Sequence, residues 1–398
     1  MLHFDVSELP DFPRKIVILG ATGSIGSQAL EIVRKYPDLL QVVGISGYHQ
    51  VDELAVIQNE FSVPHVGLAA SEESTSFTGH FGGAKMHTGK EGLVELASLE
   101  QADLVLVALV GTAGLEPTLA AIEAKKTIAL ANKEVLVMAG KFVTQAAREN
   151  GCLILPVDSE HNALFQCAQA AHDATSEIEK LILTGSGGSF RERPLDQFAS
   201  ITVEEALNHP NWDMGQKVTI DSATMANKGL ELIEAKWLFN LRPDQLEVTI
   251  HRQSIVHSMV QFCDGSILGQ LSPPSMTFPI QHCLLYPERR APVQPTLSFQ
   301  ESLNLDFSPV DFERYPCLKL AYAAMDHGGV AETVFNAANE VAVAAFVAGE
   351  LPFLRINQVI EQTLAAIPIT DPSSLDAVLD ADQQARRRAQ ELLTPTLC

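Results

Sequence analysis

Short apolar runs alternate with amphipathic segments over residues 15–150. The runs KIVILG, QVVGIS, DLVLVALVG and TIALANK have the length and composition of buried strands. Segments 24–36 and 115–125, between these runs, carry apolar residues at helical spacing. Alternating strands and helices are typical of a parallel sheet that helices cover on both faces. The pattern therefore predicts a Rossmann-like α/β domain at the amino-terminal end.

The pattern changes beyond residue 150. GCLILPV and EKLILTG are two further strand-like runs, and segment 202–238 is predicted to be mostly helical. Thr202 and Glu205 have the spacing of a capping box at the start of that segment. LEVTIH and SMVQFCDGSILGQL then predict strands between about 240 and 270. The central part of the chain is therefore predicted to be α+β.

The last quarter of the chain is predicted to be helical. A proline-rich passage at residues 287–311 has the composition of a linker. Four helical segments follow it: CLKLAYAAMDHG, AETVFNAANEVAVAAFVAGEL, INQVIEQTLAAI and residues 372–393. Short breaks between such segments favour a small helical bundle.

Composition narrows the function. A chain of 398 residues predicts two or three domains. The net charge of −22 argues against a nucleic-acid partner and an anionic membrane, which basic surfaces bind. No apolar run reaches the length of a membrane span, and MLHFDVSELPDF lacks the features of a signal peptide. Six cysteines without CxxC pairing fit a reducing cytoplasm.

The stretch GATGSIG lies between the first predicted strand and the first predicted helix. Glycines at 20, 23 and 26 allow a tight turn and let backbone N–H groups approach a pyrophosphate at the helix start. We therefore expect a dinucleotide site, and the alternative is a simple strand-to-helix turn. The second strand ends in GISGYHQ without the acid that favours NAD, so NADP is expected, with Tyr48 and His49 beside its extra phosphate.

PVDSEHNALF places Asp158 and Glu160 at the end of an apolar run. On an extended chain both side chains would point to one face and could converge on one cation. In MANKGLELIEAKW, a helix would put Asn227, Glu231 and Glu234 on one polar stripe. Carboxylates without His or Cys suit Mg²⁺ or Mn²⁺ better than Zn²⁺. The alternative is that these acids cap helices or face solvent.

Four further stretches combine polar side chains with glycines or helix starts. They are LILTGSGGSFRE with Ser186, NHPNWDMG with His209 and Trp212, DSATMANKG with Ser222 and Lys228, and LANKEVL with Asn132, Lys133 and Glu134. The first favours an anion nest, and the second, broken by proline and glycine, a mobile lid. Each also has an ordinary structural explanation. Together they predict a cleft that binds a phosphate, a metal ion and a reducible carbon.

These motifs, with YPCLKLA and NAANEVAVAAF, resemble the 1-deoxy-D-xylulose-5-phosphate reductoisomerase family in order and along nearly the whole chain. The resemblance implies a homodimer that converts 1-deoxy-D-xylulose 5-phosphate to 2-C-methyl-D-erythritol 4-phosphate in the non-mevalonate isoprenoid pathway. A metal-assisted retro-aldol and aldol isomerisation would precede hydride transfer from NADPH. It also implies an NADPH-binding domain (1–157), a catalytic and dimerisation domain (158–290) with a flap near 206–216, a linker (291–311) and a helical domain (312–398).

The resemblance also assigns residues by motif. The metal ligands and catalytic acids would be Asp158, Glu160 and Glu231, with Lys133 at the reacting oxygens. Substrate contacts would come from Lys133, Ser159, Glu160, Ser186, His209, Trp212, Ser222, Asn227, Lys228 and Glu231. Cofactor contacts would come from Thr22, Gly23, Ser24, Ile25, Gly47, Asn132, Glu134 and Gly215, in addition to Tyr48 and His49, which the residues themselves suggest.

Two positions depart from the family pattern. Many members carry a basic residue where this chain has Tyr48, and Asp-Met-Arg where it has Ser275-Met276-Thr277. We interpret the second departure as a change at a domain or dimer interface. Three other functions remain as alternatives: a metal-dependent aldolase or isomerase without a redox step, a non-catalytic NADP-sensing protein, and a semialdehyde-type dehydrogenase. The last needs a nucleophilic cysteine in a polar loop, whereas Cys152, Cys167 and Cys263 lie in apolar runs.

Overall fold

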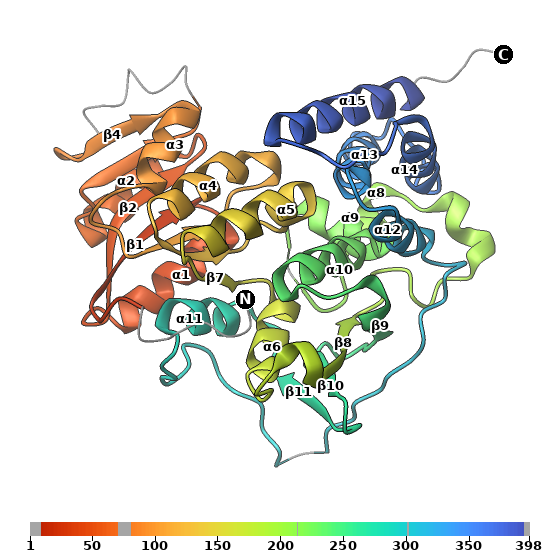
Figure 1. The fold of residues 1–398 in the computed structure, drawn as a ribbon, viewed down its shortest axis with the longest axis horizontal. Coiled ribbons are helices and arrows are strands. Elements are labelled where there is room, and N and C mark those ends of the chain that lie inside the picture. The colour runs from red at the N-terminus through yellow and green to blue at the C-terminus, as the bar shows by residue number, and fades with distance from the viewer. Residues whose placement is uncertain (1–8, 71–80, 213, 301, 394–398) are drawn as a thin grey trace. The chain divides into compact units, whose positions relative to one another are not determined.

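The computed structural model describes residues 9–70, 81–212, 214–300 and 302–393 (Figure 1). The chain forms two compact units that alternate along the sequence. Unit 1 consists of Met1–Val135, Val143–Phe165 and Ser275–Leu297, and unit 2 of Leu136–Phe142, Gln166–Pro274 and Ser298–Cys398. Residues 1–8, considered above for a signal peptide, and Asp213 of the predicted flap lie outside the described residues. The domain boundaries at 157, 290 and 311 stay a prediction.

Unit 1 contains a parallel sheet of seven strands in the order β4-β3-β2-β1-β5-β6-β7. The strands are β1 (Arg14–Leu19), β2 (Leu40–Gly47), β3 (His65–Leu68), β4 (Lys85–Thr88), β5 (Leu104–Val107), β6 (Thr127–Leu130) and β7 (Ile154–Pro156). In the central strands β1 and β5, residues 16–19 and 104–107 are almost fully buried. Burial on both faces explains why these strands are continuous apolar runs rather than alternating ones.

Helices connect the strands of unit 1 and cover the sheet. They are α1 (Ser24–Lys35), α2 (Val51–Phe61), α3 (Gly89–Ala97), α4 (Leu115–Glu123) and α11 (Thr277–Leu285), with a 3-10 turn η3 (Gly111–Gly114). Helices α5 (Lys133–Glu149) and α6 (Ser159–Ala168) each contribute residues to both units. The α1 and α4 boundaries confirm the helices predicted for 24–36 and 115–125, and the sheet confirms the Rossmann-like prediction.

A late segment of the chain returns to unit 1. Helix α11 packs against α1, β6 and β7. The guanidinium of Arg14 donates to the carbonyl oxygens of Leu284 at 3.3 Å and Tyr286 at 2.5 Å. These long-range bonds hold the segment after α11 against the start of the sheet. No local periodicity in the sequence indicates this return.

Unit 2 contains a mixed sheet in the order β11-β10-β8-β9, in which only β8 and β9 run parallel. Its strands are β8 (Ile178–Gly185), β9 (Leu246–Ile250), β10 (Val256–Phe262) and β11 (Ile267–Leu271). The helical pieces in the same part of the chain are α7 (Ala174–Glu177), η4 (Leu195–Ser200), α8 (Val203–Leu207), α9 (Gln216–Thr224), α10 (Ala226–Phe239) and η5 (Pro243–Gln245). The capping box predicted at Thr202 and Glu205 is present at the start of α8.

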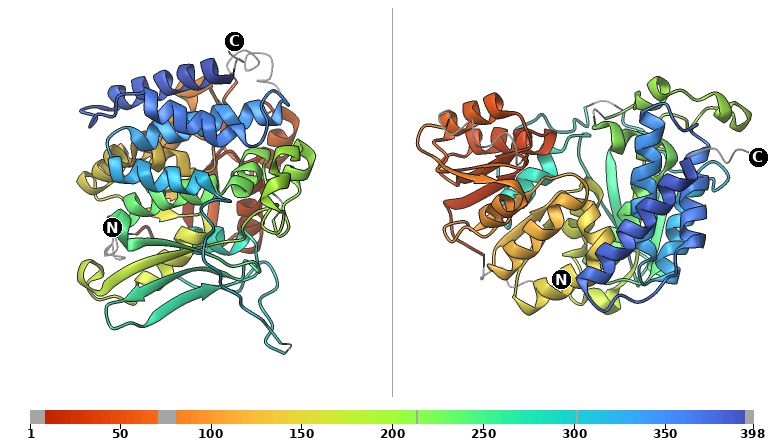
Figure 2. Two further views of the ribbon diagram at one scale, coloured as in Figure 1. Left: turned by 90° about the vertical axis from the view of Figure 1, so that its right-hand side faces the viewer. Right: turned by 90° about the horizontal axis from the view of Figure 1, so that it is seen from above.

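Four helices complete unit 2: α12 (Pro316–His327), α13 (Ala331–Val347), α14 (Arg355–Ala366) and α15 (Leu375–Leu393). They confirm the predicted bundle, and α13 contacts each of the other three (blue in Figure 2). Helix α10 contacts β8 and β9 as well as α12 and α13, so it joins the mixed sheet to the bundle. Among the described residues between α11 and α12, the one β-contact is a bridge from Ser308 to Ile250, as expected for a linker.

None of the helices that the structure describes combines the length and apolar character that crossing a membrane requires. This agrees with the absence of a bilayer-spanning apolar run in the sequence.

Candidate active site

The glycine turn lies where the sequence pattern predicted it, between β1 and α1. Gly20 has φ +91°, and a Cβ there would lie 2.5 Å from the carbonyl oxygen of Ala108. A Cβ on Gly26 would lie 2.3 Å from the carbonyl oxygen of Gly20. The backbone can therefore approach this closely only with glycine at both positions. Gly23 is the N-cap of α1 and places no side chain over the first turn, which suits an anion at the helix start.

The residues predicted around the cofactor's ribose gather at the ends of β1 and β2. A Cβ on Gly47 would lie 3.4 Å from Oγ1 of Thr22, so these positions are neighbours. The Tyr48 side chain is 64% exposed and meets the His49 ring edge-on at 5.3 Å. Gln50 was not predicted, although its Oε1 lies 3.4 Å from Oγ1 of Thr22 and accepts from the backbone N–H of His49 at 3.4 Å. The position of the Gln50 amide just after the second predicted strand is the sequence feature that could have indicated it.

Asn132 has a structural role that the sequence did not indicate. It is the N-cap of α5, and its side-chain oxygen accepts from the N–H of Val135 at 3.0 Å. Its Nδ2 donates to the carbonyl oxygens of Leu109 at 2.7 Å and Gly111 at 2.9 Å. Asn132 therefore fixes the loop after β5 to the start of the helix that carries Lys133 and the buried Glu134. Its predicted cofactor contact stays a prediction.

Lys133 and Asp158 form an ion pair in unit 1. The Lys133 ammonium lies 2.5 Å from Oδ2 of Asp158, and both side chains are nearly buried. Burial alone would raise the pKa of Asp158, but the Lys133 ammonium and the His161 imidazole together hold that pKa well below its usual range. Asp158 is therefore an ionised carboxylate whose charge a neighbouring cation balances.

The extended geometry expected for Asp158 and Glu160 is wrong. Helix α6 begins at Ser159, so Glu160 lies in the first turn of a helix. The Asp158 carboxylate accepts from the backbone N–H of Glu160 at 3.3 Å, as a helix-capping side chain does. The Ser159 hydroxyl donates to Oε2 of Glu160 at 2.5 Å. Helix capping and the predicted metal role are compatible, because a carboxylate oxygen accepts more than one partner.

Glu231 lies on α10 in unit 2, which confirms the predicted helix. Its side chain is 1% exposed. Its Oε1 accepts from the Asn227 amide and its Oε2 from the Lys228 ammonium, each at 2.5 Å. The helical stripe thus brings together three of the predicted residues, and Glu234 on the same helix is equally buried.

The predicted phosphate residues Ser186, His209 and Ser222 meet in unit 2. The Nε2 atom of His209 lies 3.2 Å from Oγ of Ser186 and 3.1 Å from Oγ of Ser222. The Ser186 hydroxyl also accepts from the N–H of Gly188 at 3.1 Å. Two hydroxyls and one imidazole N–H at such distances are the kind of donors that bind a phosphate group.

The protonation state of His209 follows from its other ring nitrogen. Its Nδ1 accepts from the backbone N–H of Asn211 at 3.1 Å and of Trp212 at 3.0 Å. A nitrogen that accepts twice carries no proton, so Nε2 carries it and the ring is neutral. Burial, with a contribution from the Arg191 charge, lowers the pKa of His209 to about 4.

Several residues that hold this loop region were not predicted. Asn211 donates its amide to the carbonyl oxygen of Arg252 at 2.7 Å and to Oγ of Ser254 at 2.8 Å. Arg191 donates to the carbonyl oxygen of Ser186 at 3.0 Å, and the Tyr315 hydroxyl to that of Gly187 at 2.8 Å. Tyr315 lies far away in the sequence, at the start of YPCLKLA, so only the fold could reveal its contact.

The remaining predicted flap residues lie near the start of α9. The Trp212 ring meets the buried His257 ring edge-on at 6.2 Å. Gly215 is the N-cap of α9, and a Cβ added there would meet nothing within 4 Å. Gly215 has a backbone conformation that other residues also adopt, and the space beside it at the start of α9 is open.

The donor set fits a hard divalent cation. Asp158 and Glu160 belong to unit 1 and Glu231 to unit 2, and all three offer carboxylate oxygens. The ammonium groups of Lys133 and Lys228 lie against the first and the last of these carboxylates. Two of the three carboxylates thus already interact with an ammonium group. All-oxygen sets of this kind prefer Mg²⁺ or Mn²⁺.

Two further residue groups named in the sequence analysis can be located in the structure. Cys152 and Cys167 are buried, but Cys263 is exposed just after β10, so its placement in an apolar run did not predict burial. Ser275 and Thr277 hydrogen-bond to each other through their hydroxyls at 2.8 Å at the start of α11. This departure from the family pattern is therefore accommodated locally, and its predicted effect on an interface stays a prediction.

A glycine turn at the start of a parallel sheet places the chain in the class of dinucleotide-binding α/β proteins. Models of three parts of one family match most of the chain. "1-Deoxy-D-xylulose 5-phosphate reductoisomerase" matches residues 16–140. The "1-deoxy-D-xylulose 5-phosphate reductoisomerase C-terminal domain" matches 154–239, and the "DXP reductoisomerase C-terminal domain" matches 271–388.

Individual proteins agree. A 1-deoxy-D-xylulose 5-phosphate reductoisomerase from Geobacillus sp. is 50% identical over 95% of this chain and 99% of its own length. One from Listeria monocytogenes is 46% identical over 96% of this chain and 100% of its own. The enzyme from Zymomonas mobilis in complex with NADPH superimposes with a TM-score of 0.90 at 41% identity, covering 96% of this chain and 100% of that one.

A further solved structure is DOX-P reductoisomerase in complex with NADPH, fosmidomycin and magnesium. It has a TM-score of 0.89 at 41% identity and covers 96% of this chain and 98% of that one. The chain therefore belongs to the 1-deoxy-D-xylulose 5-phosphate reductoisomerase family, a family of NADP-dependent oxidoreductases.

Proposed function

We propose that this chain catalyses the NADPH-dependent conversion of 1-deoxy-D-xylulose 5-phosphate to 2-C-methyl-D-erythritol 4-phosphate. The observation that carries this proposal is that the chain is 50% identical to a reductoisomerase over 95% of its own length. The order of events would be isomerisation of the carbon skeleton followed by reduction of the resulting aldehyde. The aldolase or isomerase without a redox step and the non-catalytic NADP-sensing protein have no comparable support.

The proposed cofactor site begins at the glycine turn. Residues 22–25 would surround the pyrophosphate at the start of α1, where N–H groups and the helix dipole favour negative charge. Gly47, Tyr48 and His49 would lie along the ribose and its phosphate, with Glu134 and Gly215 as further contacts. The Zymomonas mobilis relative is a complex with NADPH, which supports this choice of cofactor.

The proposed phosphate site is formed by Ser186, Ser222 and Lys228 with the neutral imidazole of His209 and the Asn227 amide. The hydroxyl oxygens of Ser186 and Ser222 already lie 3.2 and 3.1 Å from Nε2 of His209. A phosphate would accept from them in place of the bonds that they make to each other. Trp212, on the flap, would then cover the substrate and exclude water.

The proposed metal ligands are Asp158, Glu160 and Glu231, and the ion would be Mg²⁺ or Mn²⁺. A bound divalent cation supplies Lewis-acid polarisation of substrate oxygens. Lys133 would donate from its ammonium group to the oxygen that gains negative charge, while Ser159 would orient the same part of the substrate. A relative complexed with magnesium and fosmidomycin supports the choice of ion.

We further propose a homodimer in a reducing compartment such as the cytoplasm. Strand β11 is an edge strand, and its side chains Ile267, Leu268 and Leu271 are 51%, 43% and 37% exposed. An exposed apolar edge is a surface that a second copy could cover. The five cysteines within the described residues are free thiols, which fits a reducing environment.

The test is an assay of NADPH oxidation after addition of 1-deoxy-D-xylulose 5-phosphate with Mg²⁺ or Mn²⁺. We expect turnover that a chelator stops and that NADH supports poorly. Absence of turnover by protein that still binds NADPH would contradict the proposed function and support the NADP-sensing alternative. Substrate cleavage without NADPH oxidation would instead support the aldolase alternative.

A further inference from the structure

Helix α5 is kinked, and the kink lies inside unit 2. Ala139 has φ −131° and ψ 26°, outside the helical region, within a helix that otherwise runs from Lys133 to Glu149. Residues 136–142 belong to unit 2, whereas the parts of the helix before and after them belong to unit 1. The kink therefore falls in the stretch that joins α5 to the second unit.

The first contact that holds the kink is between Gly140 and Trp237. A Cβ on Gly140 would lie 2.3 Å from Cγ of the Trp237 ring and 2.4 Å from its Cδ1. The indole thus lies directly on the helix backbone, and only glycine allows this approach. Trp237 is fixed in turn, because its Nε1–H donates to Oε2 of Glu332 at 2.7 Å.

The second contact comes from α13. The buried Thr333 hydroxyl donates at 2.9 Å to the carbonyl oxygen of Met138, the residue just before the kink. Side chains that hydrogen-bond to helix carbonyls are a recognised cause of kinks. The neighbouring Glu332 also accepts from the Lys236 ammonium at 2.5 Å. The start of α13 and the end of α10 therefore act together on the same turn of α5.

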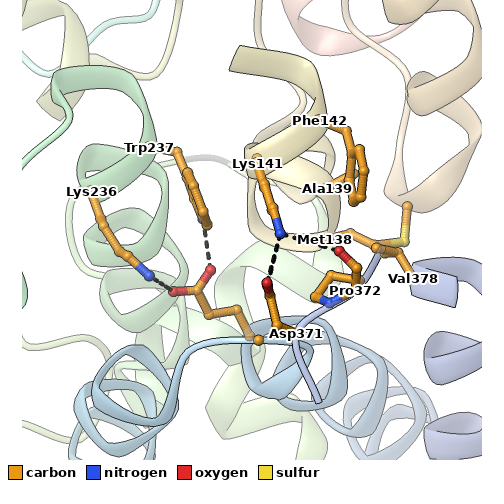
Figure 3. Close-up of a pocket in the computed structure, with 12 residues that line it drawn as sticks. Met138, Ala139, Lys141, Phe142, Lys236, Trp237, Asp371, Pro372 and Val378 are labelled. Carbon is orange, nitrogen blue, oxygen red and sulfur yellow. Dashed lines mark hydrogen bonds and ion pairs between the residues drawn. The ribbon is translucent and has the colours of Figure 1, made fainter. Parts of the chain in front are cut away.

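The third contact lies in a pocket that residues of α5, α10, α13 and the segment before α15 line. Lys141 donates to both carboxylate oxygens of Asp371, at 2.8 and 3.0 Å, and to the carbonyl oxygen of Pro372 at 3.2 Å. Figure 3 shows Lys141 directed at Asp371 beside Met138 and Ala139. Lys236 and Trp237 bond to a different acidic side chain, that of Glu332. Contacts from α10, α13 and the segment before α15 thus surround the kink.

The two helices that meet at the kink, α5 and α10, both carry proposed active-site residues. Lys133 is the first residue of α5 and precedes the kink at Ala139 by six residues, which is less than two turns of helix. On α10, Glu231 precedes Trp237 by six residues, or about 9 Å of helix. A segment this short transmits a change at the kink directly to the side chain at its start.

We propose that Thr333 and Trp237 are positioning residues that set the orientation of Lys133 through the kink of α5. The proposal rests on the proposed function of Lys133. Catalysis depends steeply on position, and a displacement of about 1 Å can cost about 100-fold in rate. These contacts form the kink clamp, which we define as Met138, Gly140, Trp237 and Thr333. The clamp would thus hold Lys133 in its catalytic position as well as stabilise the fold.

The test compares Thr333→Val, which keeps the shape and loses the hydroxyl, with Thr333→Ser, which keeps the hydroxyl. We expect kcat to fall about tenfold in Thr333→Val and to stay within about twofold of the parent in Thr333→Ser. Substrate KM should change less than kcat, because Ser186, His209 and Ser222 of the proposed phosphate site lie on segments outside the clamp. If Thr333→Ser lowered kcat as much as Thr333→Val, the hydroxyl bond would not be the positioning contact.

A double-mutant cycle separates action through Lys133 from a general structural effect. In a Lys133→Arg background, Thr333→Val should lower kcat by less than about twofold, because the group being positioned has already changed. An equal fold loss in both backgrounds would overturn the proposal. Hydrogen exchange provides a readout that needs no turnover: amides of residues 139–142 should exchange faster in Thr333→Val than in Thr333→Ser. Equal exchange rates would contradict the clamp even if the parent protein lacked the proposed activity.

Discussion

Trp212 donates its backbone N–H to Nδ1 of His209 at 3.0 Å, and this bond within the proposed flap fixes the imidazole whose Nε2 lies beside Ser186 and Ser222. The same nitrogen accepts from Asn211. Protonation of Nδ1 would turn an acceptor into a donor and break both bonds. Only neutral His209 can accept both backbone N–H groups at Nδ1 and at the same time donate from Nε2 to a phosphate.

The first prediction concerns stability in mild acid. Burial and the Arg191 charge lower the pKa of folded His209 to about 4, whereas an unfolded histidine titrates near 6.5. Between these values the unfolded chain binds the proton and the folded chain does not, so the free energy of unfolding falls as pH drops from about 6.5 to 4. His209→Asn keeps an acceptor for the flap and removes the titration.

Urea unfolding at pH 7, 6 and 5 measures this effect. Burial also lowers the pKa values of His257 and His282 to about 4, so the parent protein should lose stability through all three groups. We expect a shallower pH dependence in His209→Asn than in the parent. An identical dependence would show that His209 does not contribute.

The second prediction concerns phosphate binding. Ser222→Ala removes a hydroxyl that lies 3.1 Å from Nε2 of His209 and that would donate to the substrate phosphate. A hydrogen bond to a charged group contributes about 1.5–3 kcal/mol, so kcat/KM should fall about 10- to 100-fold. Steady-state kinetics checks this, with Ser200→Ala as a control because that hydroxyl lies on the separate turn η4. Equal losses in both variants would argue against a specific role for Ser222.

The third prediction concerns the proposed metal ligands. Glu231→Gln keeps the shape of a side chain that accepts from Asn227 and Lys228 but removes its charge. Turnover should fall by at least about 100-fold because the ion loses an anionic ligand, while NADPH binding stays unchanged. Glu247→Gln is the control, because its exposed carboxylate on β9 pairs with Lys180, and it should retain near-parental activity. If the two variants behaved alike, the three-carboxylate assignment would be wrong.

Local sequence patterns predicted the parts of the fold that are set by burial of one short segment. The strands β1 and β5 are apolar throughout because both faces of the sheet are covered. The polar stripe of Asn227, Glu231 and Glu234 correctly indicated α10. Thr202 and Glu205 indicated the start of α8 because both halves of a capping box lie within one turn.

Features that depend on distant contacts were not predicted. Strands β3 and β4 are only four residues long and lie at one edge of the sheet, so they carry little periodic signal. The bond from Arg14 to the carbonyl of Tyr286 joins residues that no sequence motif connects. In the site, Asp158 and Glu160 have the spacing expected for a strand, yet a helix starts between them. Capping by the Asp158 side chain outweighed that spacing.

The fourth prediction concerns cofactor selectivity. Tyr48 is highly exposed at the end of β2, where many family members carry a basic residue. Tyr48→Arg would place a fixed positive charge beside the extra phosphate of NADPH. The ratio of kcat/KM for NADPH to that for NADH should rise about tenfold, whereas Tyr48→Phe, which keeps the ring, should leave it unchanged. An unaltered ratio in Tyr48→Arg would place the phosphate elsewhere.

The fifth prediction uses the Lys133–Asp158 ion pair to detect the metal without an activity assay. Lys133→Met leaves the nearly buried Asp158 carboxylate without its ammonium partner. Removing one member of a buried pair costs about 3–5 kcal/mol, so the melting temperature in chelator should fall well below that of the parent. A divalent cation held by Asp158 would replace the missing positive charge.

Addition of Mg²⁺ should therefore raise the melting temperature of Lys133→Met more than that of the parent protein, by linkage of binding to folding. Lys141→Met is the control. Lys141 pairs with Asp371, whose side chain is 79% exposed, so water solvates that carboxylate when the lysine is removed. An equal effect of Mg²⁺ on all three proteins would mean that Asp158 does not hold the ion. A gain in Lys133→Met that exceeds the gain of the parent and of Lys141→Met would identify Asp158 as a ligand independently of substrate and cofactor.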